Sequence, residues 1–102
     1  MESPYMYIFV RTDLSIPQQI VQVGHAAEGA GRRFPCPGQT SNMVLFGVDG
    51  EEELKKVAYK LSMHGIDFQM FYEPDITSHT ALVTRPLFGE ERKPLKRYKL
   101  LK

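Results

Sequence analysis

The chain has 102 residues, of which 42% are hydrophobic and 25% are charged, and its formal net charge is +1. These proportions are ordinary for one small soluble domain, and no apolar stretch approaches the roughly 20 residues that a membrane-spanning helix needs. A single cysteine excludes an intrachain disulfide framework. Because the N-terminus also lacks the pattern of a signal peptide, we expect a soluble protein of the cytoplasm.

The charges are divided unevenly along the chain. Residues 1–91 contain seven Lys and Arg against twelve Asp and Glu, a net charge of −5, whereas residues 92–102 contain six Lys and Arg and no acid, a net charge of +6. A basic segment of this kind can contact phosphates, and each neutralised phosphate adds salt-dependent affinity. A solvated, positively charged terminus is the other interpretation, and charge alone leaves both open.

The first element is predicted to be a buried strand. Residues Tyr5–Val10 form a continuous apolar run rich in aromatic and β-branched side chains, which is typical of a strand covered on both faces. A polar stretch follows, and a helix then begins near Ser15, which together with Gln18 matches a capping box. Apolar residues recur at helical spacing on one predicted buried face, namely Ile16, Ile20, Val23, Ala27 and Ala30.

A second strand and a second helix follow the irregular residues 32–41. Residues 43–48 are apolar and predict a strand, and a helix is predicted to start at Asp49, with Glu52 in the capping-box position. Gly65 is the predicted C-terminal stop of this helix. Its predicted buried stripe consists of Leu54, Val57, Ala58 and Leu61.

The last third of the chain predicts two further strands and a final helix. Residues 66–72 alternate between apolar and polar, which predicts a third strand with one less-covered face. Residues 73–79 form a polar turn, and residues 80–84 predict a short fourth strand. A final helix is predicted within residues 89–98, where Pro94 divides it.

This order of elements predicts an α/β fold in a single domain, residues 1–102, with a mixed four-stranded β-sheet and helices packed on it. The order is strand–helix–strand–helix–strand–strand–helix, and the basic segment at residues 92–102 follows. In open α/β sheets, ligands usually bind at the carboxyl ends of strands. We therefore expect the beginning of the first helix and the turn at residues 73–79 to face each other across a solvent-filled hollow.

Two motifs carry a resemblance to a known family. Residues 7–14 read Tyr-Ile-Phe-Val-Arg-Thr-Asp-Leu, and residues 22–27 read Gln-Val-Gly-His-Ala-Ala. Together they resemble the opening of the type-two peptidyl-tRNA hydrolase family, whose first strand ends in Val-Arg-x-Asp-Leu and whose first helix carries Gln-x-x-His-Ala-Ala. A later turn of that family, and the threonine that begins its fourth strand, are matched more loosely by Glu73 and Thr80.

The resemblance implies an enzyme that hydrolyses the ester bond of peptidyl-tRNA and releases the peptide and free tRNA. That reaction needs a positioned water, a base and a donor that stabilises the oxyanion, but no metal or organic cofactor. The family also implies a homodimer. The candidate catalytic residues are His25, Glu73 and Thr80. The candidate substrate-binding residues, several of them cations suited to tRNA phosphates, are Arg11, Asp13, Gln22, Arg85, Arg92, Lys96 and Arg97.

The chain departs from the family pattern in one loop and one turn. The family has a lysine-rich loop between its first strand and first helix, whereas no lysine precedes Lys55 here, and Glu73 stands where the family has an aspartate. A catalytically inactive relative, acting as an RNA-binding or protein-interaction module, is therefore the alternative. Two roles also stay open: His25 is either a base or a packing residue, and Arg11 either binds phosphate or pairs with Asp13.

Overall fold

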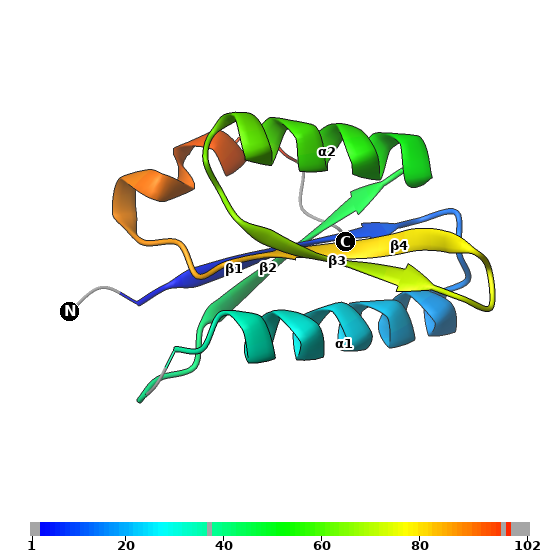
Figure 1. Cartoon of the computed structure of the whole chain (residues 1–102), viewed down its shortest axis with the longest axis horizontal. Helices are drawn as coiled ribbons and strands as arrows, with labels where there is room; N and C mark the ends of the chain where they lie inside the picture. Colours follow the sequence, from blue (N-terminus) through cyan, green and yellow to red (C-terminus); the bar gives the residue numbers. More distant parts are fainter. Residues whose placement is uncertain (1–2, 37, 97, 99–102) are drawn as a thin grey trace.

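A computed structural model describes residues 3–36, 38–96 and 98 (Figure 1). No helix within these residues is long and apolar enough to cross a membrane. The elements follow the predicted order: β1 (Tyr5–Arg11), α1 (Ile16–Arg33), β2 (Asn42–Val48), α2 (Glu51–Met63), β3 (Phe68–Glu73), β4 (Ser78–Thr84) and the 3-10 helix η1 (Gly89–Leu95).

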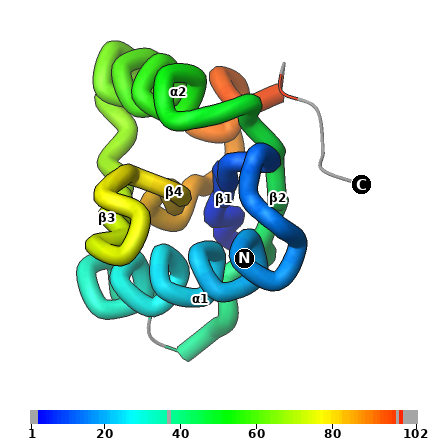
Figure 2. Tube along the Cα trace, turned by 90° about the vertical axis from the view of Figure 1, so that its right-hand side faces the viewer, coloured from blue at the N-terminus to red at the C-terminus, as the bar shows by residue number. Residues whose placement is uncertain are grey.

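The four strands form one mixed sheet in the order β2-β1-β4-β3. β1 pairs with β2 in parallel, and β4 runs antiparallel to both β1 and β3. Figure 2 shows the sheet as the middle layer, with α1 on one face and α2 on the other. The predicted α/β fold, with helices packed on a mixed four-stranded sheet, is confirmed.

β1 is central in the sheet and is buried on both faces, as its apolar run predicts. Tyr7 and Phe9 pack in the cluster on the α2 face, whereas Met6, Ile8 and Val10 pack in the cluster on the α1 face. All five side chains are at most 5% exposed. Since full burial of a large apolar side chain contributes about 1.5–3 kcal/mol, β1 anchors both halves of the core.

The start of α1 is capped as predicted, but its buried face is not the predicted one. Ser15 is the N-cap, and its side chain and that of Gln18 each accept the other residue's backbone N–H. The predicted stripe is wrong at its beginning, because Ile16 and Ile20 are 71% and 68% exposed. The buried side chains are Gln22, Ala26 and Ala30, of which Ala30 belongs to the predicted stripe, and Val23 of that stripe is partly buried.

Packing explains this rotation of α1. Small side chains at Ala26 and Ala30 let the helix approach β4 and β3 closely. Gln22 is buried because its amide bonds to side chains from the same two strands. Ile16 and Ile20 are left beside a partly apolar groove next to β2, which α1 does not cover. That groove is lined by Val10, Thr12, Ile16, Gln19, Ile20, Val23 and Leu45.

α2 begins at Glu51, later than the predicted Asp49, and it ends just before the predicted stop at Gly65. The predicted capping box starting at Asp49 is wrong, because Gly50 is the N-cap and no side chain caps the helix. Three glutamates occupy the first turn, where their negative charges interact favourably with the positive end of the helix dipole. Gly65 has φ of +70°, a conformation that glycine adopts at no steric cost. The N–H groups of Gly65 and Ile66 bond to the carbonyls of Ser62 and Leu61, which completes a Schellman cap.

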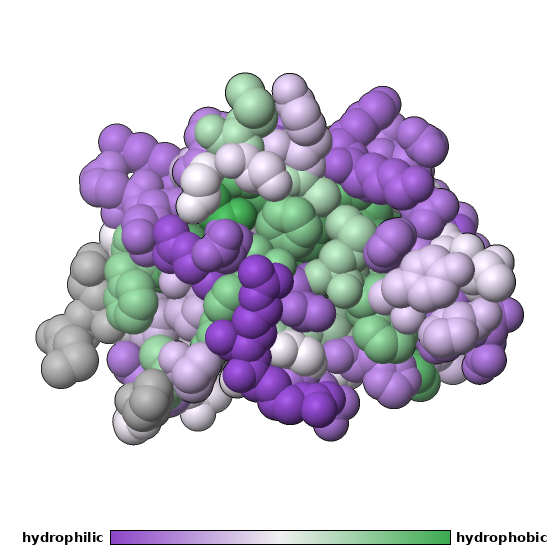
Figure 3. All heavy atoms as spheres, viewed as in Figure 1, coloured by the Kyte–Doolittle hydropathy of each residue, from purple (hydrophilic) through white to green (hydrophobic). Residues whose placement is uncertain are grey.

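β3 and β4 form a hairpin whose strands extend further toward the turn than predicted, so that the turn is shorter. Glu73 pairs with Ser78, so the connection is only residues 74–77, whereas the pattern predicted a turn over residues 73–79. β3 is an edge strand of the sheet, and its residues are partly buried except Tyr72, which is exposed. In Figure 3, apolar surface occupies the middle of the face on which β3 lies, with polar side chains around it.

The predicted final helix is a 3-10 helix, Gly89–Leu95, with Pro94 inside it. A 3-10 helix is normally used in short pieces, and here it returns the chain to the beginning of β1. An isolated bridge pairs Leu87 with Tyr5. Beyond the helix, the Tyr98 ring packs edge-on against Phe9 at 5.0 Å between centroids, which closes the core on the α2 face.

Candidate functional site

A hollow of about 300 Å³ lies between the first turns of α1 and the β3–β4 turn. This is where the sequence predicts a hollow between the first helix and the bend ahead of the fourth strand. None of the described residues that line it is a lysine or an arginine. The lining consists of Pro17, Gln18, Val21, Gln22, Glu73, Asp75 and Ile76.

A series of hydrogen bonds connects three of the predicted site residues. The Thr80 hydroxyl donates to Gln22 Oε1 at 2.6 Å, and Gln22 Nε2 donates to Glu73 Oε1 at 2.9 Å. An ionised carboxylate only accepts hydrogen bonds, so the amide nitrogen of Gln22 must face Glu73 and its oxygen must face Thr80. Thr80 and Gln22 are 0% and 4% exposed. The amide is therefore held in one orientation by both partners.

A β-bulge in β4 gives Thr80 its direction. Phe71 pairs with Ala81 but Tyr72 pairs with His79, so Thr80 is the extra residue. Leu82 faces α2, and simple alternation would put Thr80 on that face too. The bulge instead turns Thr80 toward Gln22 on α1, as bulges near functional sites commonly re-aim a side chain.

Glu73 is charged at neutral pH. The hydrogen bond from Gln22 is the largest influence that holds the pKa of Glu73 below its usual range, and burial acts against it. The backbone N–H of Asp75, 3.4 Å from Glu73 Oε2, and the charge of His25 also lower this pKa. Glu73 therefore acts as a hydrogen-bond acceptor and a weak base.

His25 lies one turn beyond Gln22, on the same side of α1. His25 is exposed, and its imidazole ring stacks on the ring of Phe71 with 4.7 Å between the ring centroids and 16° between the ring planes. Phe71 and Glu73 are two residues apart and so share one face of β3. The structure thus places the three candidate catalytic residues His25, Glu73 and Thr80 on the α1 face of the sheet.

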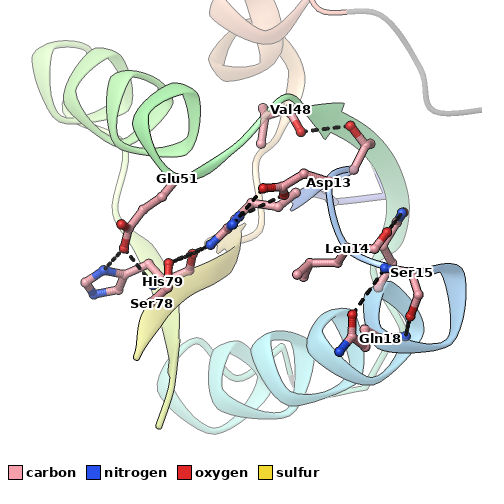
Figure 4. A network of polar contacts seen from close by, with 11 residues as sticks. Asp13, Leu14, Ser15, Gln18, Val48, Glu51, Ser78 and His79 are labelled. Carbon is pink, nitrogen blue, oxygen red and sulfur yellow. Dashed lines mark hydrogen bonds and ion pairs between the residues drawn. The ribbon is translucent and has the colours of Figure 1, made fainter. Parts of the chain in front are cut away.

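Arg11 takes part in a separate network on the α2 face. Figure 4 labels its partners Asp13 and Ser78. Its guanidinium donates to both carboxylate oxygens of Asp13 at 3.0 and 2.7 Å, and Nη1 donates to Ser78 Oγ at 2.5 Å. The bond to Asp13 raises the pKa of Arg11, and the same bond lowers the pKa of Asp13. Of the two interpretations of Arg11, pairing with Asp13 is the one observed.

Glu51 connects this network to the beginning of α2. It accepts the backbone N–H of His79 at 2.8 Å, and this bond is the largest cause of its lowered pKa, followed by a bond from Ser78. His79 Nδ1 lies 3.4 Å from Glu51 Oε2, an ion pair only when the imidazole is protonated. The edge of the His79 ring contacts Tyr72, with 5.1 Å between centroids. These contacts tie α2 to the β3–β4 hairpin.

Two of the predicted substrate-binding arginines are engaged in internal contacts. Arg85 forms an ion pair with Glu91 at 3.2 Å. The guanidinium of Arg92 lies 3.4 Å above the centre of the Tyr5 ring, and its Nε donates to the Tyr7 hydroxyl at 2.7 Å. The bond to Tyr7 is the largest cause of the raised pKa of Arg92. Both cations stabilise the fold around the beginning of β1.

This basic region does not border the hollow. Tyr5 begins β1 and Arg11 ends it, and at about 3.3 Å per residue the two ends of this strand lie roughly 20 Å apart. Lys96 follows η1 and is exposed, whereas Arg97 lies outside the described residues. Arg85 and Arg92, two of the candidate substrate-binding residues, therefore lie away from the hollow.

Sequence reasoning missed three residues of these networks. Ser78 and Asp75 lay in the predicted turn but were not singled out, and Glu51 was not among the candidates either. Ser78 meets Arg11 because β4 pairs with β1, a contact between distant parts of the chain, so no local pattern identifies it. Among the described residues, no three His, Cys, Asp or Glu side chains are placed to hold a metal ion.

Comparisons with known proteins establish the fold. No protein-family model matches the chain, and no curated protein matches it. The chain is similar to the solved structure of a protein of unknown function from Agrobacterium tumefaciens strain C58, with 14% identity, 100% of both chains covered and a TM-score of 0.69. At this identity the likeness shows the α/β fold alone.

Proposed function

We propose that this chain hydrolyses the ester bond of peptidyl-tRNA in the cytoplasm and releases the peptide and free tRNA. The observation that carries the proposal is the series Thr80–Gln22–Glu73 beside the hollow at the start of α1. The resemblance of residues 7–14 and 22–27 to type-two peptidyl-tRNA hydrolases supports the same reaction.

The residues divide the chemistry among themselves. Glu73, ionised and half-buried, accepts a hydrogen bond from the attacking water and orients it beside the ester carbonyl. His25, as a neutral imidazole, accepts the proton of the water as its oxygen bonds to the ester carbon, and returns that proton to the ribose oxygen as the ester C–O bond breaks. Gln22 Nε2 carries a second hydrogen, which is free to bond to the developing oxyanion. Thr80 donates its hydrogen to Gln22 and is therefore a positioning residue.

Binding of tRNA must use cations outside the hollow. Arg11, Arg85 and Arg92 have internal partners, so phosphates would meet exposed side chains such as Lys96. Since the hollow contributes no cation among the described residues, we place only the acyl end of the substrate there and the tRNA body outside it.

The test is release of tRNA from purified N-acetyl-phenylalanyl-tRNA. We expect turnover above background for the unchanged protein, a loss of about 100-fold or more in kcat/KM for Glu73→Gln, and a smaller loss for Thr80→Val. Glu52→Gln, on an exposed first-turn residue of α2, is the matched control and keeps full activity. A folded protein without turnover, or equal rates for Glu73→Gln and Glu52→Gln, would refute the reaction.

A second candidate is a catalytically inactive module that binds RNA or a protein partner. The absence of lysine and arginine from the described lining of the hollow favours it, as does the partly apolar edge strand β3 (Figure 3). Salt-dependent retention of tRNA without hydrolysis would identify an RNA-binding module. A concentration-dependent homodimer by analytical ultracentrifugation, with no tRNA retention, would identify a protein-interaction module instead.

A further inference from the structure

We infer that the groove between α1 and β2 is closed by a second copy of this chain, which presents the same groove in return and so forms a two-fold symmetric dimer. The groove has a volume of about 490 Å³. The proposed reaction does not use this surface, so the inference goes beyond the proposed function and does not depend on it. Three observations on the two elements that border the groove support it.

The first observation is an uncovered part of the sheet. α1 packs on β1, β3 and β4, and the α1 side of β2 lies open next to it. Met43 and Leu45 are in register with two side chains of β1 that belong to the core cluster on the α1 face, so they point to that face as well. Gly47, in register with Val10, adds no side chain there. Met43 is 54% exposed, so this part of the sheet offers apolar surface to a second molecule.

The second observation is a row of apolar side chains on α1 that borders the groove. Ile16, Ile20 and Val23 recur at steps of four and three and therefore share one side of the helix. Ile16 and Ile20 are 71% and 68% exposed, although isoleucine is not a residue that exposed helix positions favour. The two isoleucines form a ridge beside a recess. Because a second copy has the same ridge and the same recess, a two-fold axis lets each ridge fill the recess of the other copy.

The third observation is the absence of charge along both borders of the groove. Residues 14–27 and residues 34–48 contain no Lys, Arg, Asp or Glu, so the 13 Lys and Arg and the 12 Asp and Glu all lie elsewhere in the chain. The cores of protein interfaces are depleted of charged residues. Near a two-fold axis, each charged side chain would also meet the same side chain of the other copy, and like charges repel. An uncharged surface is therefore complementary to itself, whereas a surface for a different partner has no such restriction.

The hollow of the proposed reaction stays open in this dimer. Gln18 and Val21 of α1 line the hollow, whereas Ile16 and Ile20 line the groove. These two pairs lie on different sides of the helix. Each copy therefore keeps its own hollow accessible to solvent.

Analytical ultracentrifugation tests the dimer. We expect the unchanged protein to dimerise with a Kd of about 100 µM or below. Ile20→Glu should weaken the dimer at least about 100-fold, because it places a charge twice in an apolar interface, whereas Ile20→Leu should keep the dimer. Met63→Glu is the matched control, because Met63 lies on α2 and is 69% exposed, and it should leave the Kd unchanged. A monomer at about 500 µM, or the same Kd for Ile20→Glu and Met63→Glu, would overturn the inference.

NMR spectra and salt dependence locate the surface without any substitution. The amide resonances of residues 16–27 and 42–48 should shift between dilute and concentrated samples, and those of residues 73–76 should not. Because the surface carries no charge, the Kd should stay within about tenfold between roughly 50 and 500 mM NaCl. Shifts confined to β3, or a Kd that rises by more than about tenfold with salt, would overturn the inference, because they would identify the edge strand β3 or an ionic contact as the interface.

Discussion

The hydrogen bond between Thr80 and Gln22 is predicted to stabilise the folded protein measurably. Thr80→Val keeps the shape of a side chain that is 0% exposed but removes the donor 2.6 Å from Gln22 Oε1. The amide oxygen is then buried without a partner, which costs about 1–3 kcal/mol of the free energy of unfolding. For a domain of this size, each kcal/mol lowers the unfolding midpoint by about 4–8 °C.

A double-mutant cycle isolates this hydrogen bond. Gln22→Met removes the acceptor, so adding Thr80→Val to it should cost much less than Thr80→Val alone, and the coupling should reach about 1 kcal/mol. Urea unfolding followed by circular dichroism gives the four free energies, provided that the m value is unchanged. Thr12→Val removes an exposed hydroxyl that donates to Val48 and is the control, because it should be additive with Gln22→Met. Coupling below about 0.3–0.5 kcal/mol for Thr80 would refute the reasoning.

Three further predictions concern the surroundings of the site. Because the pKa of Glu73 is lowered in the folded state, its contribution to stability is present above the ordinary value of about 4.3 and is lost as pH falls through the folded pKa. Gln22→Met should therefore raise the pKa of Glu73 in a carbon-13 NMR titration, and an unchanged pKa would contradict the assigned cause. Glu51→Ala should lower the thermal midpoint more than Glu52→Ala, because only Glu51 accepts the His79 N–H; equal midpoints would exclude the tie between α2 and β4. Gly65→Ala should cost about 1 kcal/mol or more in urea unfolding, because its φ is +70°, and an unchanged stability would show that the cap tolerates a side chain.

Local features of the fold were predictable because their causes lie close together in the sequence. The apolar run of β1 and the capping box of Ser15 and Gln18 each depend on a few neighbouring residues. The rotation of α1 was not predictable in this way. Hydrophobic periodicity favours burial of Ile16 and Ile20. However, the side of a helix that becomes buried also depends on how far the sheet extends beneath it. Since β2 is not covered by α1, both isoleucines remain exposed.

The sequence identified candidate site residues one by one, but it did not predict the hydrogen bonds that connect them. Gln22, Glu73 and Thr80 were all candidates, with Gln22 assigned to substrate binding and the others to catalysis. Their connection depends on the extra residue in β4, because a strand that alternated regularly would turn Thr80 to the other face. A bulge changes no local composition, so the sequence pattern around residue 80 gives no indication of it.

The same alternation explains why Arg11 is not among the described residues that line the hollow. Arg11 follows Tyr7 and Phe9 at steps of two, so it shares their α2 face, while Gln22 and Glu73 lie on the α1 face. A shift of one residue in β1 would be needed to bring the guanidinium to the hollow, and it would also turn the core side chains of β1 outward. If the reaction in the hollow uses a positive charge, that charge must therefore come from a group other than the described residues that line it.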